Sequence, residues 1–211
     1  MSYALSVEMP GKEKEAESNV RRGTKWNIVR RSVHCILSLA IIYYWLPEPL
    51  FIEGVHRWYV LLGAVLIACT VEFVRLKRKK TFPGMRSYEE SRIASYVYAV
   101  IGVAVVLSIS PDIVGVPCIL GMAWCDPLAG ELRHVKVDDM RIATFTAITY
   151  ALIALFSLTI LRAEPTTMIL LITAMAPLAV LSEQIDIKHL DDDLTMLVIP
   201  AVAGTLLVKI I

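Results

Sequence analysis

The sequence predicts an all-α membrane protein, a polytopic bundle of about seven transmembrane helices whose N-terminus is cytoplasmic. Of its 211 residues, 56% are hydrophobic and only 19% are charged, whereas an ordinary soluble domain has about a quarter of its residues charged. The uncharged residues gather in seven runs, most of them near the length that crosses a bilayer as a helix. With a cytoplasmic N-terminus, 18 of the 21 Lys and Arg residues lie on the inner side, as the positive-inside rule requires. A disordered chain, a disulfide-rich secreted module, a fibrous repeat and a coiled coil are excluded.

Residues 1–27 are polar and carry charges of both signs. We expect them to form a flexible cytoplasmic tail, followed by a single membrane domain at residues 28–211. The first apolar run contains no small-residue cleavage site, so we do not expect a removable signal peptide.

The seven apolar runs predict the membrane helices in order. The run at 142–161 is 20 residues long without a charge, and it is the clearest span. The first and fourth runs are short, so one of them could be re-entrant, which leaves six spans as the alternative. The runs are 33–46, 58–74, 93–110, 113–125, 142–161, 166–182 and 194–208.

Local sequence patterns predict where several helices begin or bend. Ser87 and Glu90 form a capping-box pattern ahead of the third run, which predicts a helix start there. Pro177 and Pro200 lie inside the sixth and seventh runs and predict kinks that loosen the bundle locally. Candidate caps for the last three helices are Asp138 or Asp139, Thr166 or Thr167, and Asp193.

Candidate functional residues gather at the cytoplasmic ends of the predicted helices. Arg31 and His34 share a face of the first helix, where they are either interfacial side chains that snorkel or a phosphate clamp with a proton carrier. Glu72 and Arg75 are three residues apart and form either a structural ion pair or an intramembrane functional site.

The basic residues after the second run have two different interpretations. The run at 75–80 is most simply a topology determinant that also attracts anionic headgroups. Arg86 follows Pro83-Gly84 and is a better candidate for a specific phosphate contact.

The acidic residues at these helix ends predict a metal site. Asp126 closes the fourth run and is followed by Pro127, a common helix terminator, and by small residues up to Gly130. Glu183 follows the sixth run, and three aspartates at 191–193 precede the seventh. Capping explains only one of these three. Carboxylates together with substrate phosphate oxygens are the ligands that Mg²⁺ prefers, so we expect a Mg²⁺–phosphate site at the cytoplasmic face.

Other chemistry is not indicated. The sequence contains no P-loop, dinucleotide-binding, zinc-protease or nucleophile-elbow motif, and its basic residues lack the interleaved aromatics that would indicate nucleic acid binding. The cysteines are not spaced for metal binding, and we expect four buried free thiols: Cys35, Cys69, Cys118 and Cys125.

Four segments taken together resemble the CTP-dependent polyprenol kinases, a family of integral membrane proteins that includes the dolichol and phytol kinases. The resemblance extends over about residues 28–205. The segments are 30–34, Glu72 with Arg75, 126–130, and Glu183 with 192–200. The resemblance implies a membrane lipid kinase that transfers the γ-phosphate of CTP, with Mg²⁺ as cofactor, to the terminal hydroxyl of an isoprenoid alcohol. Residues 28–211 would then be the catalytic domain.

The resemblance also implies roles for individual residues. One carboxylate, Asp126 or Asp193, would accept the alcohol proton, and the isoprenoid tail would lie between helices near Pro177 and Pro200. The catalytic residues would be Asp126, Glu183, Asp193 and His34; the metal ligands Asp126, Glu183 and Asp192; and the nucleotide phosphates would contact Arg31, Arg75, Arg86 and Gly130.

Three positions depart from the family pattern, and they leave CTP and ATP both open as the phosphoryl donor. Cys125 stands in place of a glycine, Asp193 in place of an asparagine, and the stretch 131–134 in place of a glycine-containing continuation.

Two other functions stay open. A CTP-dependent cytidylyltransferase that makes CDP-linked lipids would also need CTP and Mg²⁺, but its Lys-Asp-rich signature is not found here. A small transporter or membrane scaffold would not need the acidic helix ends, and a transporter would be expected to show midplane charges or an inverted repeat.

The compact loops favour a prokaryotic protein of the cell membrane, archaeal by preference. The expected partners are the nucleotide, the isoprenoid alcohol and the bilayer.

Overall fold

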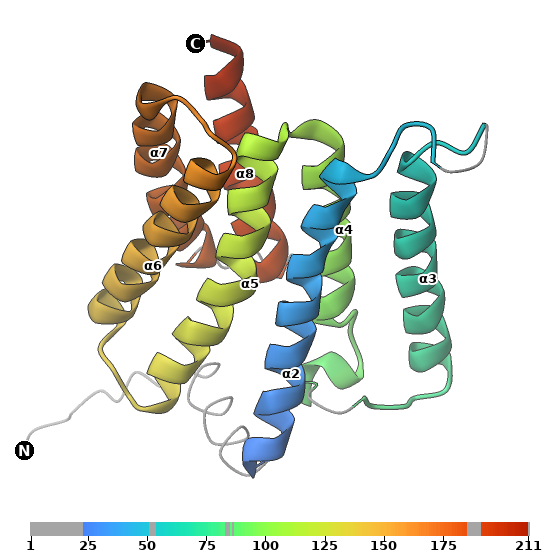
Figure 1. The fold of residues 1–211 in the computed structure, drawn as a ribbon. Helices are drawn as coiled ribbons and strands as arrows, with labels where there is room; N and C mark the ends of the chain where they lie inside the picture. Colours follow the sequence, from blue (N-terminus) through green and yellow to red (C-terminus); the bar gives the residue numbers. More distant parts are fainter. Residues whose placement is uncertain (1–22, 51–53, 83–84, 86, 185–190, 211) are drawn as a thin grey trace, which may run out of the picture.

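The structure, a computed structural model, describes residues 23–50, 54–82, 85, 87–184 and 191–210. These residues form helices and no strand, which confirms the all-helical prediction (Figure 1). The helices are α2 Gly23–Ser38, η1 Leu39–Trp45, α3 Trp58–Lys77, η2 Ser87–Glu90, α4 Ser95–Ile109, α5 Asp112–His134, α6 Asp139–Ile160, α7 Pro165–Gln184 and α8 Asp192–Ile210, where η marks a 3₁₀-helix.

Five of the described helices, namely α3, α5, α6, α7 and α8, are long and apolar enough to cross a membrane, and α4 is a shorter apolar helix. The chain therefore has the character of a multi-pass integral membrane protein. The first predicted run, 33–46, is not one α-helix, because the backbone changes from α2 to the 3₁₀-helix η1 at Leu39. In addition, α2 begins at Gly23, inside the segment 1–27 that the sequence assigns to the tail, and residues 1–22 lie outside the described residues. The seven-span count and the orientation stay predictions.

The expectation that the fourth helix is short and ends at Asp126 is wrong. Helix α5 continues through Asp126 and Pro127 for two further turns and ends at His134. A proline removes only one donor from the helical ladder. Two ion pairs hold the last turns in place, Glu131 with Arg31 and Arg133 with Glu183. Asp126 therefore lies inside the longest described helix, where its orientation is set by packing.

Helix starts differ from the predicted ones by a few residues. Ser87 and Glu90 belong to η2, and α4 begins only at Ser95, whose backbone N–H donates to the Glu89 side chain at 2.9 Å. Asp138 occupies the N-cap position of α6, as predicted, but its side chain makes no capping hydrogen bond. Helix α7 begins at Pro165, ahead of the predicted threonine caps, because proline suits a first helical position.

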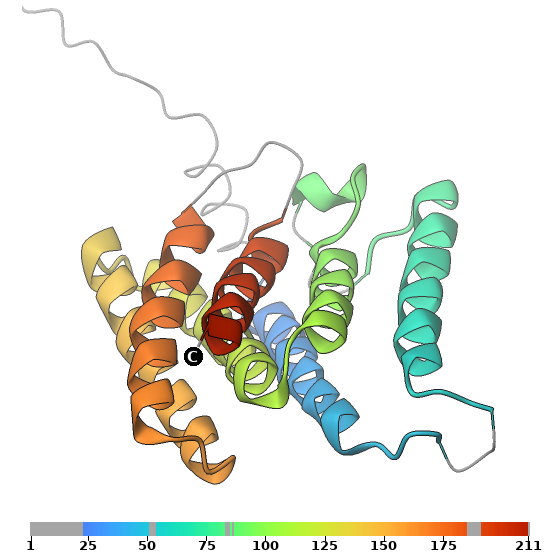
Figure 2. The ribbon, with the colours of Figure 1, turned by 90° about the horizontal axis from the view of Figure 1, so that it is seen from above.

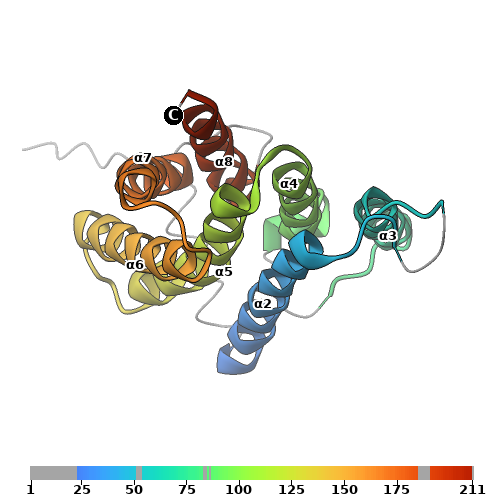
Figure 3. The same cartoon turned by 45° about the horizontal axis from the view of Figure 1, so that its top comes forward.

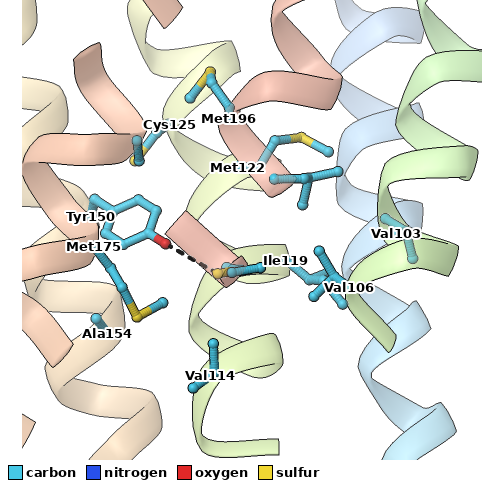
Figure 4. Close-up of a cluster of buried hydrophobic side chains, with 14 of the residues drawn as sticks. Val103, Val106, Val114, Ile119, Met122, Cys125, Tyr150, Ala154, Met175 and Met196 are labelled. Atoms are coloured by element: carbon cyan, nitrogen blue, oxygen red, sulfur yellow. Dashed lines mark hydrogen bonds between the residues drawn. The ribbon is translucent and has the colours of Figure 1, made fainter. Parts of the chain in front are cut away.

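Helix α5 lies at the centre of the bundle (Figures 2 and 3). It packs against α2, η1, α4, α6 and α8, and α7 packs on α6 and α8. Helix α3 stands at one edge, where it packs on α4 (Figure 3). The core around α5 includes Ile119, Met122, Tyr150, Met175 and Met196 (Figure 4). This arrangement brings α2 and α8 to two sides of α5.

The prediction of four buried thiols is half right. All four cysteines are free, and Cys118 and Cys125 are buried. Cys35 and Cys69 are exposed, because neighbouring helices cover less of α2 and α3 than of α5. In a bilayer such surfaces face lipid, and a cysteine behaves there as a small apolar residue.

Gly121 allows the close contact between α5 and α6. A Cβ atom at Gly121 would lie 2.2 Å from the Tyr150 ring, and that ring is fully buried. We expect Gly121→Ala to lower the free energy of unfolding by about 1–3 kcal/mol, the usual cost of overpacking. Thermal unfolding of the purified protein in detergent measures the effect. The matched control is Gly63→Ala on α3, where an added Cβ meets nothing within 4 Å. Equal unfolding midpoints for the two variants would contradict the proposed role of Gly121.

Candidate functional site

Three buried side chains from three helices meet near one end of the bundle. They are His34 of α2, Asp126 of α5 and Asp193 of α8, which are 4%, 5% and 1% exposed. The His34 Nε2 atom lies 3.2 Å from Oδ2 of Asp126, and one ligand atom from each of the three side chains lies within 4.8 Å of the others. We call these three residues the buried cluster.

The start of α8 explains why Asp193 belongs to this cluster. The sequence predicts Asp193 as the cap of the last helix, but Asp191 takes that role, since its Oδ1 accepts a hydrogen bond from the Asp193 backbone N–H at 3.2 Å. The Asp193 side chain itself lies buried in the bundle. Thr195 ties this turn to the end of α7, because its hydroxyl donates to the Ser182 carbonyl at 3.1 Å.

More carboxylates surround the buried cluster. Asp191 and Asp192 form a second close group with Asp193, at a helix N-terminus where negative charge is favoured. Glu183, whose side chain is 3% exposed, closes α7 just before the segment that leads to these aspartates. The structure thus gathers the predicted metal ligands, Asp126, Glu183 and Asp192, at the same end of the bundle.

Two arginines form ion pairs with glutamates at the edge of this acidic region. Arg133 of α5 forms an ion pair with Glu183, whose side chain is 3% exposed, while Arg133 itself is 47% exposed. The predicted phosphate-binding residue Arg31 forms an ion pair with Glu131 of α5, and both are partly exposed. Sequence reasoning missed Arg133 and Glu131 because it ended the helix at Asp126. Continuing the helical period would have placed Arg133 on the same face as Asp126.

Arg75 is not part of this gathering. Its Nε and Nη2 atoms each donate to Glu72 at 2.7 Å, and Nη2 also donates to the Arg92 carbonyl at 2.6 Å. Glu72 in turn accepts from the Ala94 backbone N–H at 2.8 Å and from the Tyr96 hydroxyl at 2.9 Å. This buried pair joins α3 to the start of α4. The Arg75 guanidinium thus donates its hydrogen bonds within the protein. Arg75 is therefore not one of the phosphate-binding residues proposed below.

The remaining residues predicted for the site lie in different surroundings or outside the described part of the chain. Gly130 is exposed on α5, and a Cβ there would meet no described atom within 4 Å, so the space beside it is open. Arg86 lies outside the described residues. Pro200 is buried whereas Pro177 is exposed, and α7 and α8 pack directly on each other. The position of the isoprenoid tail near these two prolines stays a prediction.

The loop between η1 and α3 lies at the end of the bundle away from the start of α8 (Figure 1), and it carries exposed polar side chains. In the loop between η1 and α3, Glu48 accepts from the His56 ring and from the Arg57 backbone N–H. The hydrogen bond from His56 is the main cause that lowers the pKa of the Glu48 carboxyl below its ordinary value. These side chains are exposed, and exposed ion pairs contribute little to stability. These exposed charged groups differ from the buried carboxylates and imidazole of the buried cluster.

The donor set of the buried cluster fits a divalent cation. Two buried carboxylates and one imidazole offer oxygen and nitrogen donor atoms within 4.8 Å of one another. Carboxylate oxygens suit Mg²⁺, and an imidazole adds a nitrogen ligand. The half-exposed arginines at the rim suit an anion such as a phosphate. The arrangement is therefore suited to hold a metal ion and a phosphorylated ligand side by side.

A comparison with known protein families, curated proteins and solved structures finds no match to this chain.

Proposed function

We propose that this protein is a membrane lipid kinase that transfers the γ-phosphate of CTP, or of another nucleoside triphosphate, to the terminal hydroxyl of an isoprenoid alcohol. The observation that carries the proposal is the buried cluster of His34, Asp126 and Asp193, surrounded by further carboxylates and two arginines. The Lys and Arg distribution favours a cytoplasmic location for this end of the bundle, where nucleotides are present. A lipid alcohol reaches the same end from the bilayer.

The acidic residues would hold the nucleotide through its metal ion. Asp126 and Asp193 are buried, and Glu183 and Asp192 lie beside them, so these carboxylates would bind Mg²⁺. The bound ion supplies charge neutralisation for the phosphate oxygens. Phosphoryl transfer needs little covalent help from the protein, and most of the rate comes from positioning and charge stabilisation.

Arg31 and Arg133 would bind the phosphate oxygens directly. Each is held in an ion pair, with Glu131 and Glu183 respectively, and each is partly exposed. A triphosphate carries several negative charges and forms strong bidentate contacts with a guanidinium. On nucleotide binding the arginines would exchange their glutamate partners for phosphate oxygens, and Glu183 would turn to the metal ion.

One carboxylate would accept the proton of the alcohol. Asp126 and Asp193 are the candidates, and His34 lies against Asp126 at 3.2 Å. An imidazole at this distance can hold the Asp126 carboxylate in position for that step. The open space beside Gly130, on the same helix as Asp126, leaves room for the nucleotide.

The test is a transfer assay with labelled nucleotide. Purified protein in detergent or lipid is incubated with Mg²⁺, a panel of isoprenoid alcohols, and CTP labelled at either the γ- or the α-phosphate. We expect the γ label alone to enter the organic phase, and the panel then identifies the alcohol. Parallel reactions with ATP decide between the two donors.

Two outcomes would overturn the proposal. Transfer of the α label would instead show a cytidylyltransferase that makes CDP-linked lipids. Transfer of neither label from CTP or ATP, with folded protein and the full alcohol panel, would favour a transporter or a membrane scaffold.

A further inference from the structure

The buried cluster contains a nitrogen donor, His34, in addition to its two carboxylates. We propose that the cluster binds Mn²⁺ in preference to Mg²⁺, with the His34 imidazole as a direct ligand together with Asp126 and Asp193. This inference deepens the proposed function, because the bound ion would be the one that holds the nucleotide. It rests on the proposed function for the substrate, but the metal binding itself is tested without a substrate.

The spacing of the donor atoms fits a single ion. Two adjacent ligands with metal bonds of about 2.1 Å lie about 3 Å apart, and the His34 Nε2 to Asp126 Oδ2 distance is 3.2 Å. All three ligand atoms lie within 4.8 Å of one another, which permits adjacent or opposite positions around one ion. Three protein ligands leave the other positions of an octahedral ion for phosphate oxygens and water.

The chemistry of the donor set decides between the ions. Mg²⁺ is bound in proteins almost entirely by oxygen. Imidazole is a ligand typical of transition metals, whereas carboxylate and water suit Mg²⁺, Ca²⁺ and Mn²⁺. Mn²⁺ accepts both kinds of donor and also binds triphosphate oxygens. A site with one nitrogen and two oxygens therefore favours Mn²⁺ over Mg²⁺.

The burial of the donor side chains suits a bound cation. The His34, Asp126 and Asp193 side chains come from three helices and are all at least nine-tenths buried. Glu183, whose side chain is 3% exposed, adds a further carboxylate at the end of α7. A divalent cation would bind oxygens of both aspartates and the imidazole nitrogen at once.

Electron paramagnetic resonance of Mn²⁺ bound to the purified protein, without nucleotide, tests the inference. We expect one tightly bound Mn²⁺ whose electron-spin-echo signal shows coupling to a nitrogen nucleus. In His34→Gln the nitrogen coupling should disappear and the affinity should fall at least about 10-fold, as for the loss of a metal-site interaction. Mg²⁺ should displace the bound Mn²⁺ only at about 10-fold or greater excess.

The chain contains three other histidines as matched controls: His56, His134 and His189. Replacing each of them with Gln should leave both the nitrogen coupling and the Mn²⁺ affinity unchanged. If His34→Gln does not fold, Asp193→Asn serves as the second variant, and it should weaken Mn²⁺ binding while the nitrogen coupling of the remaining bound ion persists.

The outcomes separate this inference from the proposed function. Mn²⁺ bound without nitrogen coupling, no Mn²⁺ binding, or equal competition by Mg²⁺ would overturn the inference, even if γ-phosphate transfer with Mg²⁺ is observed. Nitrogen-coupled Mn²⁺ in a protein that transfers no phosphate would uphold the inference and remove the kinase assignment.

Discussion

We expect replacement of Asp126 with Asn to abolish the proposed phosphoryl transfer and to leave the helix bundle folded. The reason is that Asp126 is the carboxylate at the centre of the buried cluster, 3.2 Å from His34 and within reach of Asp193. The amide has the same shape but no charge, so it removes one proposed metal ligand and proton acceptor without opening a cavity. We expect a loss of at least about 10³-fold in rate, equivalent to about 4 kcal/mol.

The measurement is γ-label transfer at saturating nucleotide, together with the thermal unfolding midpoint of the same preparation. Asp112→Asn is the matched control. Asp112 begins the same helix at its other end, where its side chain accepts from the Ile113 backbone N–H. This variant should keep full activity. An Asp126→Asn protein with activity near that of the parent would remove Asp126 from the metal site and from the proton transfer.

The largest effect on stability is expected at Glu72. The Glu72 carboxylate accepts hydrogen bonds from Arg75, Ala94 and Tyr96, and the Arg75 side chain is completely buried. Glu72→Ala leaves the guanidinium buried without its carboxylate partner, which typically costs 3–5 kcal/mol. Hydrogen exchange on α3 and α4, together with thermal unfolding in detergent, would detect the loss of this contact between α3 and α4.

Two further variants separate the ion pair from the packing around it. Tyr96→Phe removes one hydrogen bond and should cost about 1 kcal/mol. The double variant Glu72→Leu with Arg75→Leu removes both charges and should be more stable than Glu72→Ala, because apolar pairs often replace buried ion pairs without loss. A Glu72→Ala protein as stable as the Tyr96→Phe protein would show that the pair does not hold α3 to α4.

The Glu72–Arg75 ion pair also explains how α3, an apolar helix at the edge, stays attached to the bundle. Helix α3 packs on α4 and exposes most of its apolar surface, including Leu66, Ile67 and Phe73. Lipid tails cover such a surface as well as protein does, so apolar burial does little to hold two membrane helices together. A buried, fully hydrogen-bonded ion pair is then an effective contact between them.

Several features of this protein follow from local sequence. Helices α3, α4, α6, α7 and α8 form within a few residues of where composition and length predict them, because a chain in lipid must satisfy its backbone hydrogen bonds within each segment. His34, Asp126, Glu183 and the aspartates 191–193 stood out from their residue types alone, since charged groups at membrane helix ends call for a partner or a function.

Other features depended on contacts that local sequence does not contain. An Asp-Pro pair usually ends a helix, yet α5 runs on to His134, held by partners on α2 and α7. The same continuation brought Arg133 into the acidic region. Likewise, the sequence offered Asp193 as the helix cap, but Asp191 caps α8 and Asp193 turns inward.

The sequence by itself determined the helical class, the membrane character and the set of residues from which a site could be built, because these depend on composition and on the helical period. Only the tertiary structure decided that His34, Asp126 and Asp193 meet while Arg75 stays with Glu72. Which side chains face one another depends on how α2, α5 and α8 pack together and how far each helix continues. Those outcomes are set by contacts between residues far apart in the chain.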